Sequence, residues 1–199
     1  MKALLRKDVY QLAAYCKSML LVVGVFGAVS VFSQDNLFFF AYPIIVMGLL
    51  PVSMLSYDER SRWNDFCACL PVSKGAIVGE KYLLGLLLVV PTAVLLTALR
   101  GVGTAISGSF DLADLMQLGG VTLALGLLSI ELCMPFFFKF GVEKGRIVYY
   151  VAICIFVAAS FAAKTLPKLP TLAAPAAVAL AAIGYAVSWS LSVKMYRTK

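Results

Sequence analysis

The chain has few residues suited to covalent or metal chemistry. It contains no histidine, and its five cysteines lack the spacing of a zinc site. It also has no Gly-Lys dipeptide, and therefore no G-x-x-x-x-G-K-[ST] loop to cradle the phosphates of ATP. We therefore expect no enzyme activity, no catalytic residues, and no metal or cofactor held by this chain itself.

The residues from 57 to 82 are instead suited to binding. They read YDERSRWNDFCACLPVSKGAIVGEKY, and Trp63, Phe66 and Leu70 recur at i, i+3 and i+7. This spacing predicts a short amphipathic helix with one apolar stripe. Pro71 would separate it from a second short helix, which Ser73 would cap. Such a first helix lies along a membrane surface or docks into a groove on a partner, and the pattern leaves both open.

Glu131 is the other candidate, because it is a carboxylate within an apolar run. It precedes Lys139 by eight residues, or about 12 Å of helix. An intramembrane carboxylate is expensive and usually faces protein or a water-filled cavity. Glu131 would either line a pathway that attracts a cationic, amphipathic substrate or make a structural contact with a neighbouring helix.

These residues must be positioned by membrane-spanning helices. The apolar runs cover 18–33, 37–56, 83–105, 115–138, 147–163 and 171–193. A hydrocarbon core needs about 20 apolar helical residues, and no run alternates like a barrel strand. The sequence predicts an all-α integral membrane protein with six transmembrane helices and a single domain over 1–199.

The basic residues predict the orientation. Fourteen of the 17 Lys and Arg fall on one side of this layout, and only Arg100, Lys164 and Lys168 fall on or near the other. The positive-inside rule then places both termini and the 57–82 loop in the cytoplasm, with the chain in the cell (plasma) membrane. The net charge of +7 is a topology and lipid signal, not a sign of nucleic-acid binding. A cleavable signal peptide is the competing interpretation of the first run, but its removal would leave five spans.

Residues 1–17 predict an amphipathic elbow helix on the inner leaflet. Leu5, Val9, Leu12 and Cys16 share one face of it. Basic residues on this segment would contact lipid phosphates, namely Lys2, Arg6 and Lys7. The alternative is one long, tilted first helix.

Several local sequences resemble the ABC-2 type of ATP-binding-cassette permease, in its short six-span group of phenol-soluble-modulin and related peptide exporters. The opening MKALLRKD resembles the basic start of that group. The loop resembles it more specifically, in DERSRW (58–63), LPVSK (70–74) and IVGEKY (77–82). The six-span layout extends the resemblance to the whole chain.

The resemblance implies a permease subunit whose 57–82 loop is a coupling helix held by a separate nucleotide-binding ATPase subunit. That ATPase would bind ATP and Mg, and a second permease chain, identical or related, would complete the assembly. The substrate would be an amphipathic peptide, a lipid-like molecule or a small antimicrobial, moved outward. The implied contact residues are Tyr57, Asp58, Glu59, Arg60, Arg62, Trp63, Phe66 and Leu70. The alternative function is a membrane anchor or regulatory scaffold that recruits a cytosolic partner and transports nothing.

Overall fold

A computed structural model describes most of the chain, and every regular element in that part is an α-helix. The described residues are 2–15, 17–32, 37–69, 73–106, 108, 110–141, 147, 150, 151, 154 and 173–197. The helices are α1 (Lys2–Tyr15), α2 (Lys17–Phe32), α3 (Leu37–Arg60), α4 (Trp63–Ala68), α5 (Lys74–Ile106), α6 (Leu112–Phe140) and α8 (Ala173–Arg197).

Four of these helices are long and apolar enough to cross a membrane. Their spanning parts are Phe39–Arg60, Lys74–Ile106, Leu112–Phe140 and Ala174–Tyr196. The all-helical membrane class is therefore confirmed. The six-span count stays a prediction, because α2 has only 16 residues and most of the predicted span 147–163 lies outside the described residues.

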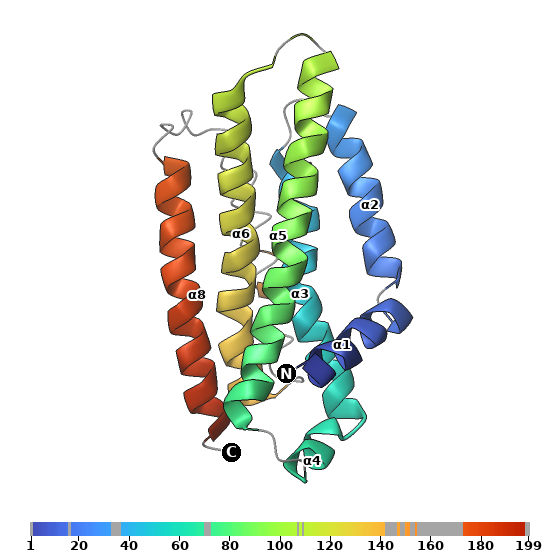
Figure 1. Ribbon diagram of the computed structural model, residues 1–199, viewed down its shortest axis with the longest axis vertical. Helices are drawn as coiled ribbons and strands as arrows, with labels where there is room; N and C mark the ends of the chain where they lie inside the picture. The colour runs from blue at the N-terminus through green and yellow to red at the C-terminus, as the bar shows by residue number, and fades with distance from the viewer. Residues whose placement is uncertain are drawn as a thin grey trace.

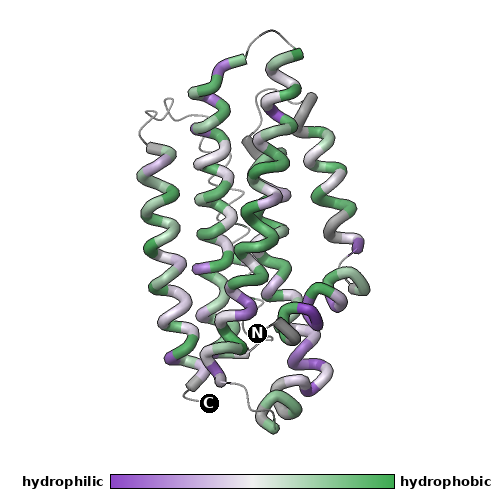
Figure 2. The backbone as a smooth tube through the Cα atoms, viewed as in Figure 1, coloured by the Kyte–Doolittle hydropathy of each residue, from purple (hydrophilic) through white to green (hydrophobic). Residues whose placement is uncertain are grey.

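The long helices run side by side, with α1 and α4 gathered at one end of the bundle (Figure 1). Both chain termini lie at that same end. Figure 2 shows apolar residues along the length of the bundle and most of the hydrophilic segments near α1 and α4. The end of the bundle that carries α1 and α4 is therefore the described part of the chain best suited to contact water and soluble partners.

The core is formed where α3, α5 and α6 pack closely. Gly126 of α6 allows this approach, because a Cβ there would lie 2.5 Å from Val89 of α5 and 2.9 Å from Ile44 of α3. Small residues at such crossings let membrane helices pack backbone to backbone. The buried cluster around them includes Leu49, Val78, Leu96, Ile130, Met134 and Phe137.

The N-terminal segment forms a helix separate from α2, inclined to it in Figure 1. Its buried positions differ from the predicted apolar face. Leu4 and Asp8 are buried, whereas Val9 is 52% exposed. The reason is that α1 packs against α3 and α5, where a buried acid finds cationic partners.

The predicted second short helix of the loop does not exist separately. Residues from Lys74 onward are the first turns of α5, which continues without a break to Ile106. Ser73 does cap this start, since its Oγ accepts a hydrogen bond from the amide of Ala76 at 3.2 Å. Leu70 lies outside the described residues.

Candidate functional site

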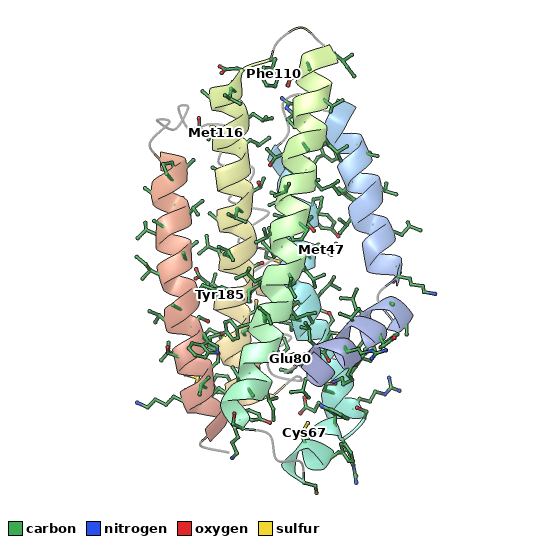
Figure 3. The ribbon with its side chains drawn as sticks, viewed as in Figure 1. Met47, Cys67, Glu80, Phe110, Met116 and Tyr185 are labelled. Atoms are coloured by element: carbon green, nitrogen blue, oxygen red, sulfur yellow. The ribbon has the colours of Figure 1, made fainter. Side chains whose placement is uncertain are left out.

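A group of five charged side chains joins three helices at the α4 end of the bundle. We call it the ionic cluster: Lys7 and Asp8 from α1, Asp58 from α3, and Glu80 and Lys81 from α5. Figure 3 shows Glu80 between α5 and α1. All but Lys7 are at most 3% exposed, so their charges are removed from solvent.

Two cations and two anions of the cluster pair with one another. Lys7 Nζ lies 2.9 Å from Asp8 Oδ1 and 2.5 Å from Asp58 Oδ1. Lys81 Nζ contacts the carboxylate of Asp8 and lies 2.7 Å from Asp58 Oδ2. Each lysine therefore bridges both aspartates. Because an uncompensated buried charge is strongly destabilising, the four groups hold α1, α3 and α5 in one arrangement.

The electrostatic state of Asp8 follows from these partners. Burial alone would raise the pKa of its carboxyl. Hydrogen bonding with Glu80, together with the charge and hydrogen bonds of Lys81 and Lys7, outweighs burial and holds the pKa below its ordinary value of 3.8. Asp8 is thus the carboxylate that anchors α1 in the bundle.

The turn between α3 and α4 extends the cluster to the molecular surface. Lys7 Nζ lies 4.5 Å from the centroid of the Trp63 ring, a cation–π contact. The rings of Trp63 and Phe66 lie 5.3 Å apart. Arg62 makes the turn with a left-handed φ of 54°. The aromatic residues of α4 are therefore linked through Lys7 to the buried charges.

The surface of this turn has the features of a docking element. Phe66 is 56% exposed, while the next residue of α4, Cys67, is buried. A groove of about 470 Å³ opens beside it, between α1 and the end of α3. The groove is lined by Lys7, Gln11, Tyr57, Asp58, Arg60, Ser61 and Trp63.

The predicted contact residues that the structure describes fall into three groups by exposure. Glu59, Arg60, Arg62 and Phe66 are exposed, and Tyr57 and Trp63 are half-buried. Asp58 is buried in the ionic cluster, so it can support a docking surface but not form part of it. Lys7, expected to contact lipid phosphates, instead bridges two carboxylates.

Sequence reasoning missed Asp8, Glu80 and Lys81 as members of a site. The pair Asp8 and Lys81 is separated by 73 positions, and nothing in the sequence specifies that pairing. One signal was available. Asp8 adjoins the otherwise apolar face of Leu5, Leu12 and Val9, where an acid is unfavourable unless it has a partner.

Glu131 lies apart from the cluster, at the contact of α6 with α8. Its carboxylate packs against Gly184, where a Cβ would lie 2.4 Å from Oε2. Its main-chain oxygen accepts a hydrogen bond from Ser188 at 2.8 Å. Ser188 also bonds the hydroxyl of Tyr82 at 2.7 Å. This polar contact joins α5, α6 and α8.

Helices able to span a membrane, with a buried ionic cluster and an exposed aromatic turn at one end, define a polytopic helical membrane protein. A family model described as ABC-2 family transporter protein matches residues 3–197. The chain therefore belongs to this family, whose members are membrane subunits of ATP-binding-cassette transporters that work with an ATPase partner. No curated protein and no solved structure matches the chain.

Proposed function

We propose that this chain is the permease subunit of an exporter and that its ATPase binds at the α4 end. The contact is the docking surface, which we define as Glu59, Arg60, Arg62, Trp63 and Phe66. Exposure supports this assignment, because Trp63 is half-buried and the other four residues are exposed. The composition supports it as well, because aromatic and Arg residues are enriched among binding hot spots. The docking surface then faces the cytoplasm of the cell (plasma) membrane, as the positive-inside rule predicts.

The single observation that carries this proposal is the path from α4 to the ionic cluster. Trp63 touches Lys7, and Lys7 bridges Asp8 and Asp58. A displacement of α4 by the ATPase therefore acts on α1, α3 and α5 together rather than on a flexible loop. Interlocked charges of this kind favour rigid-body movement of the helices, which is how access to a pathway changes in transporters.

The pathway requires a second permease chain in this proposal. Large apolar side chains stay exposed on α2, α5 and α8, and lipid and a second chain would share these faces. Those exposed side chains include Leu21, Val25, Val94, Leu95, Leu180 and Ile183.

The substrate is an amphipathic peptide, a lipid-like molecule or a small antimicrobial. Glu131 is the pathway candidate, as a half-buried carboxylate among apolar helices.

The test compares two phenylalanines of equal exposure at opposite ends of the bundle. Phe66 is 56% exposed at α4, and Phe110 is 55% exposed beyond the far end of α5. The native permease and its co-purifying ATPase are reconstituted in lipid vesicles, and ATP hydrolysis and substrate export are measured. Phe66→Ala should uncouple hydrolysis from export at least tenfold, consistent with a hot-spot loss of about 1.4 kcal/mol or more.

Phe110→Ala is the matched control and should leave both rates unchanged. Equal behaviour of the two variants would contradict the assignment of the docking surface. Recruitment of the ATPase with no change in hydrolysis and no export would instead identify a regulatory scaffold.

A further inference from the structure

The ionic cluster contains one more acid than it has bases. Its acids are Asp8, Asp58 and Glu80, and its bases are Lys7 and Lys81. All of them except Lys7 are at most 3% exposed. If every group were charged, the cluster would bury a net negative charge, which is strongly unfavourable. One proton bound by one of the acids makes the cluster neutral.

The contacts identify the acid that carries this proton. Asp8 and Asp58 are each bridged by both lysines, whereas Glu80 Oε2 lies 4.0 Å from Lys81 Nζ. No donor among the described residues reaches the buried Oε1 of Glu80. Glu80 instead hydrogen-bonds with Asp8. An ionised carboxylate only accepts hydrogen bonds, so this contact requires one protonated partner. Because the lysines hold Asp8 ionised, Glu80 is the donor.

The other titratable groups around Glu80 leave this assignment in place. The described groups that face it are Lys7 and Asp8 from α1, Asp58 and Glu59 from α3, Cys67 from α4, Lys81 from α5 and Tyr196 from α8. The described residues of α2 and α6 add no charged group to this set. Both bases in the set are already shared between the two aspartates of the cluster. Glu80 is therefore compensated by a proton rather than by a lysine.

A small cavity connects Glu80 with the surface of the molecule. Its volume is about 90 Å³, and Glu59, Trp63 and Glu80 are among the residues that line it. This space corresponds to about three waters, each of which occupies about 30 Å³ in the liquid. Glu59 is exposed, so the cavity extends from a buried carboxyl group to one in contact with solvent. A proton has a short path between Glu80 and water.

We propose that the ionic cluster is a proton-binding site, and that the proton carried by Glu80 helps to hold α1 against α5. While the two helices are packed, the carboxyl group of Glu80 donates to the carboxylate of Asp8. When they separate, Glu80 meets water, ionises and releases its proton to the solvent, and Asp8 stays ionised throughout.

The release of one proton makes this joint sensitive to pH. Above the pKa of an exposed glutamate, about 4.3, a separated Glu80 is ionised while the packed Glu80 is protonated. Each unit rise in pH then favours separation tenfold, because the separated state binds one proton fewer. The joint between α1 and α5 therefore weakens as the pH rises. This inference does not depend on the proposed function.

The experiment is thermal unfolding of the purified, full-length permease in a mild detergent, from about pH 5 to about pH 7. The chain contains no histidine, so no side chain with an ordinary pKa titrates in this interval. The melting temperature of the wild type should fall by about 3–5 °C per pH unit. Glu80→Gln binds no proton, but its amide still donates to Asp8. This variant should lose most of that fall and, near neutral pH, should melt no lower than the wild type.

Two further variants complete the test. Asp114→Asn removes an exposed carboxyl group of α6 and should retain the pH dependence of the wild type. Glu80→Met leaves two lysines facing two aspartates and should lose that dependence, as Glu80→Gln does. If Glu80→Gln does not fold, Glu80→Met decides the proposal.

Three results would overturn the inference. The first is a wild-type melting temperature that does not change over this pH interval. The second is a fall with pH that persists unchanged in Glu80→Gln. The third is a Glu80→Gln variant that is destabilised equally at every pH, which would show that Glu80 is ionised in the cluster. All of these measurements use the permease without its ATPase, so none of them bears on the docking test with Phe66→Ala.

Discussion

Removing Lys81 is the sharpest test of the ionic cluster. Its side chain is 2% exposed and bridges Asp8 and Asp58. Lys81→Met keeps much of the side-chain length but leaves both aspartates to share Lys7 alone. Breaking a buried pair by removing one partner costs about 3–5 kcal/mol. For a chain of this size, each kcal/mol shifts the melting temperature by about 2–4 °C. We therefore expect a decrease of roughly 6–20 °C.

The assay is thermal unfolding of the purified permease in a mild detergent, with one matched control and one rescue. Lys74→Gln changes an exposed lysine on the same helix and should shift stability by less than about 0.5 kcal/mol. Lys81→Met combined with Asp8→Leu leaves Lys7 paired with Asp58 and should recover a large part of the loss, because residues in one network are not additive. A Lys81→Met variant as stable as Lys74→Gln would refute the cluster as a structural joint, as would a double variant less stable than the sum of its parts.

Two further predictions concern the same bundle. The pKa of Asp8 is lowered in the folded state, so this group contributes stability above pH 3.8 that is lost as the pH falls through its folded pKa. The melting temperature should therefore fall in acid, and Asp8→Asn should flatten that pH dependence. A melting temperature that falls as steeply in acid for Asp8→Asn as for the wild type would contradict the pairing. Gly126→Ala should destabilise the protein by about 1–3 kcal/mol through its contacts with Val89 and Ile44. Gly24→Ala, where no described atom beyond the chain neighbours and the backbone of its own helix lies within 4 Å of the added Cβ, should be neutral or stabilising by up to about 1 kcal/mol. Denaturant unfolding of the two glycine variants checks this pair, and equal effects would show that the α3–α5–α6 crossing is loosely packed.

Hydropathy predicted the long helices well, because burial in lipid demands continuous apolar runs. The runs at 37–56, 83–105, 115–138 and 171–193 lie within α3, α5, α6 and, but for its first residues, α8. The stripe of Trp63 and Phe66 likewise predicted the helix that became α4. These signals are local, and the sequence carries them in full.

The ionic cluster could not be predicted from local sequence patterns. A charged residue near the end of an apolar run is usually solvated or bound to lipid, and for that reason the sequence predicts a lipid contact for Lys7. The charges of Glu80 and Lys81 made residues 73–82 resemble a polar loop. In the structure both of these residues belong to α5 and are buried. Their burial is possible only because α1 returns to the bundle and supplies Asp8. That contact depends on tertiary packing, which periodicity does not encode.

Labelling of Cys69 tests the central claim most directly, namely that α4 faces the cytoplasm and is covered there by an ATPase. Cys69 is exposed just after α4, whereas Cys67 is buried, and burial raises the pKa of the Cys67 thiol. A variant retaining only Cys69 is treated with a membrane-impermeant maleimide. We expect labelling in inside-out vesicles, protection when the ATPase is added, and no labelling of intact cells. Labelling of intact cells, or labelling unaffected by a saturating ATPase, would contradict the account.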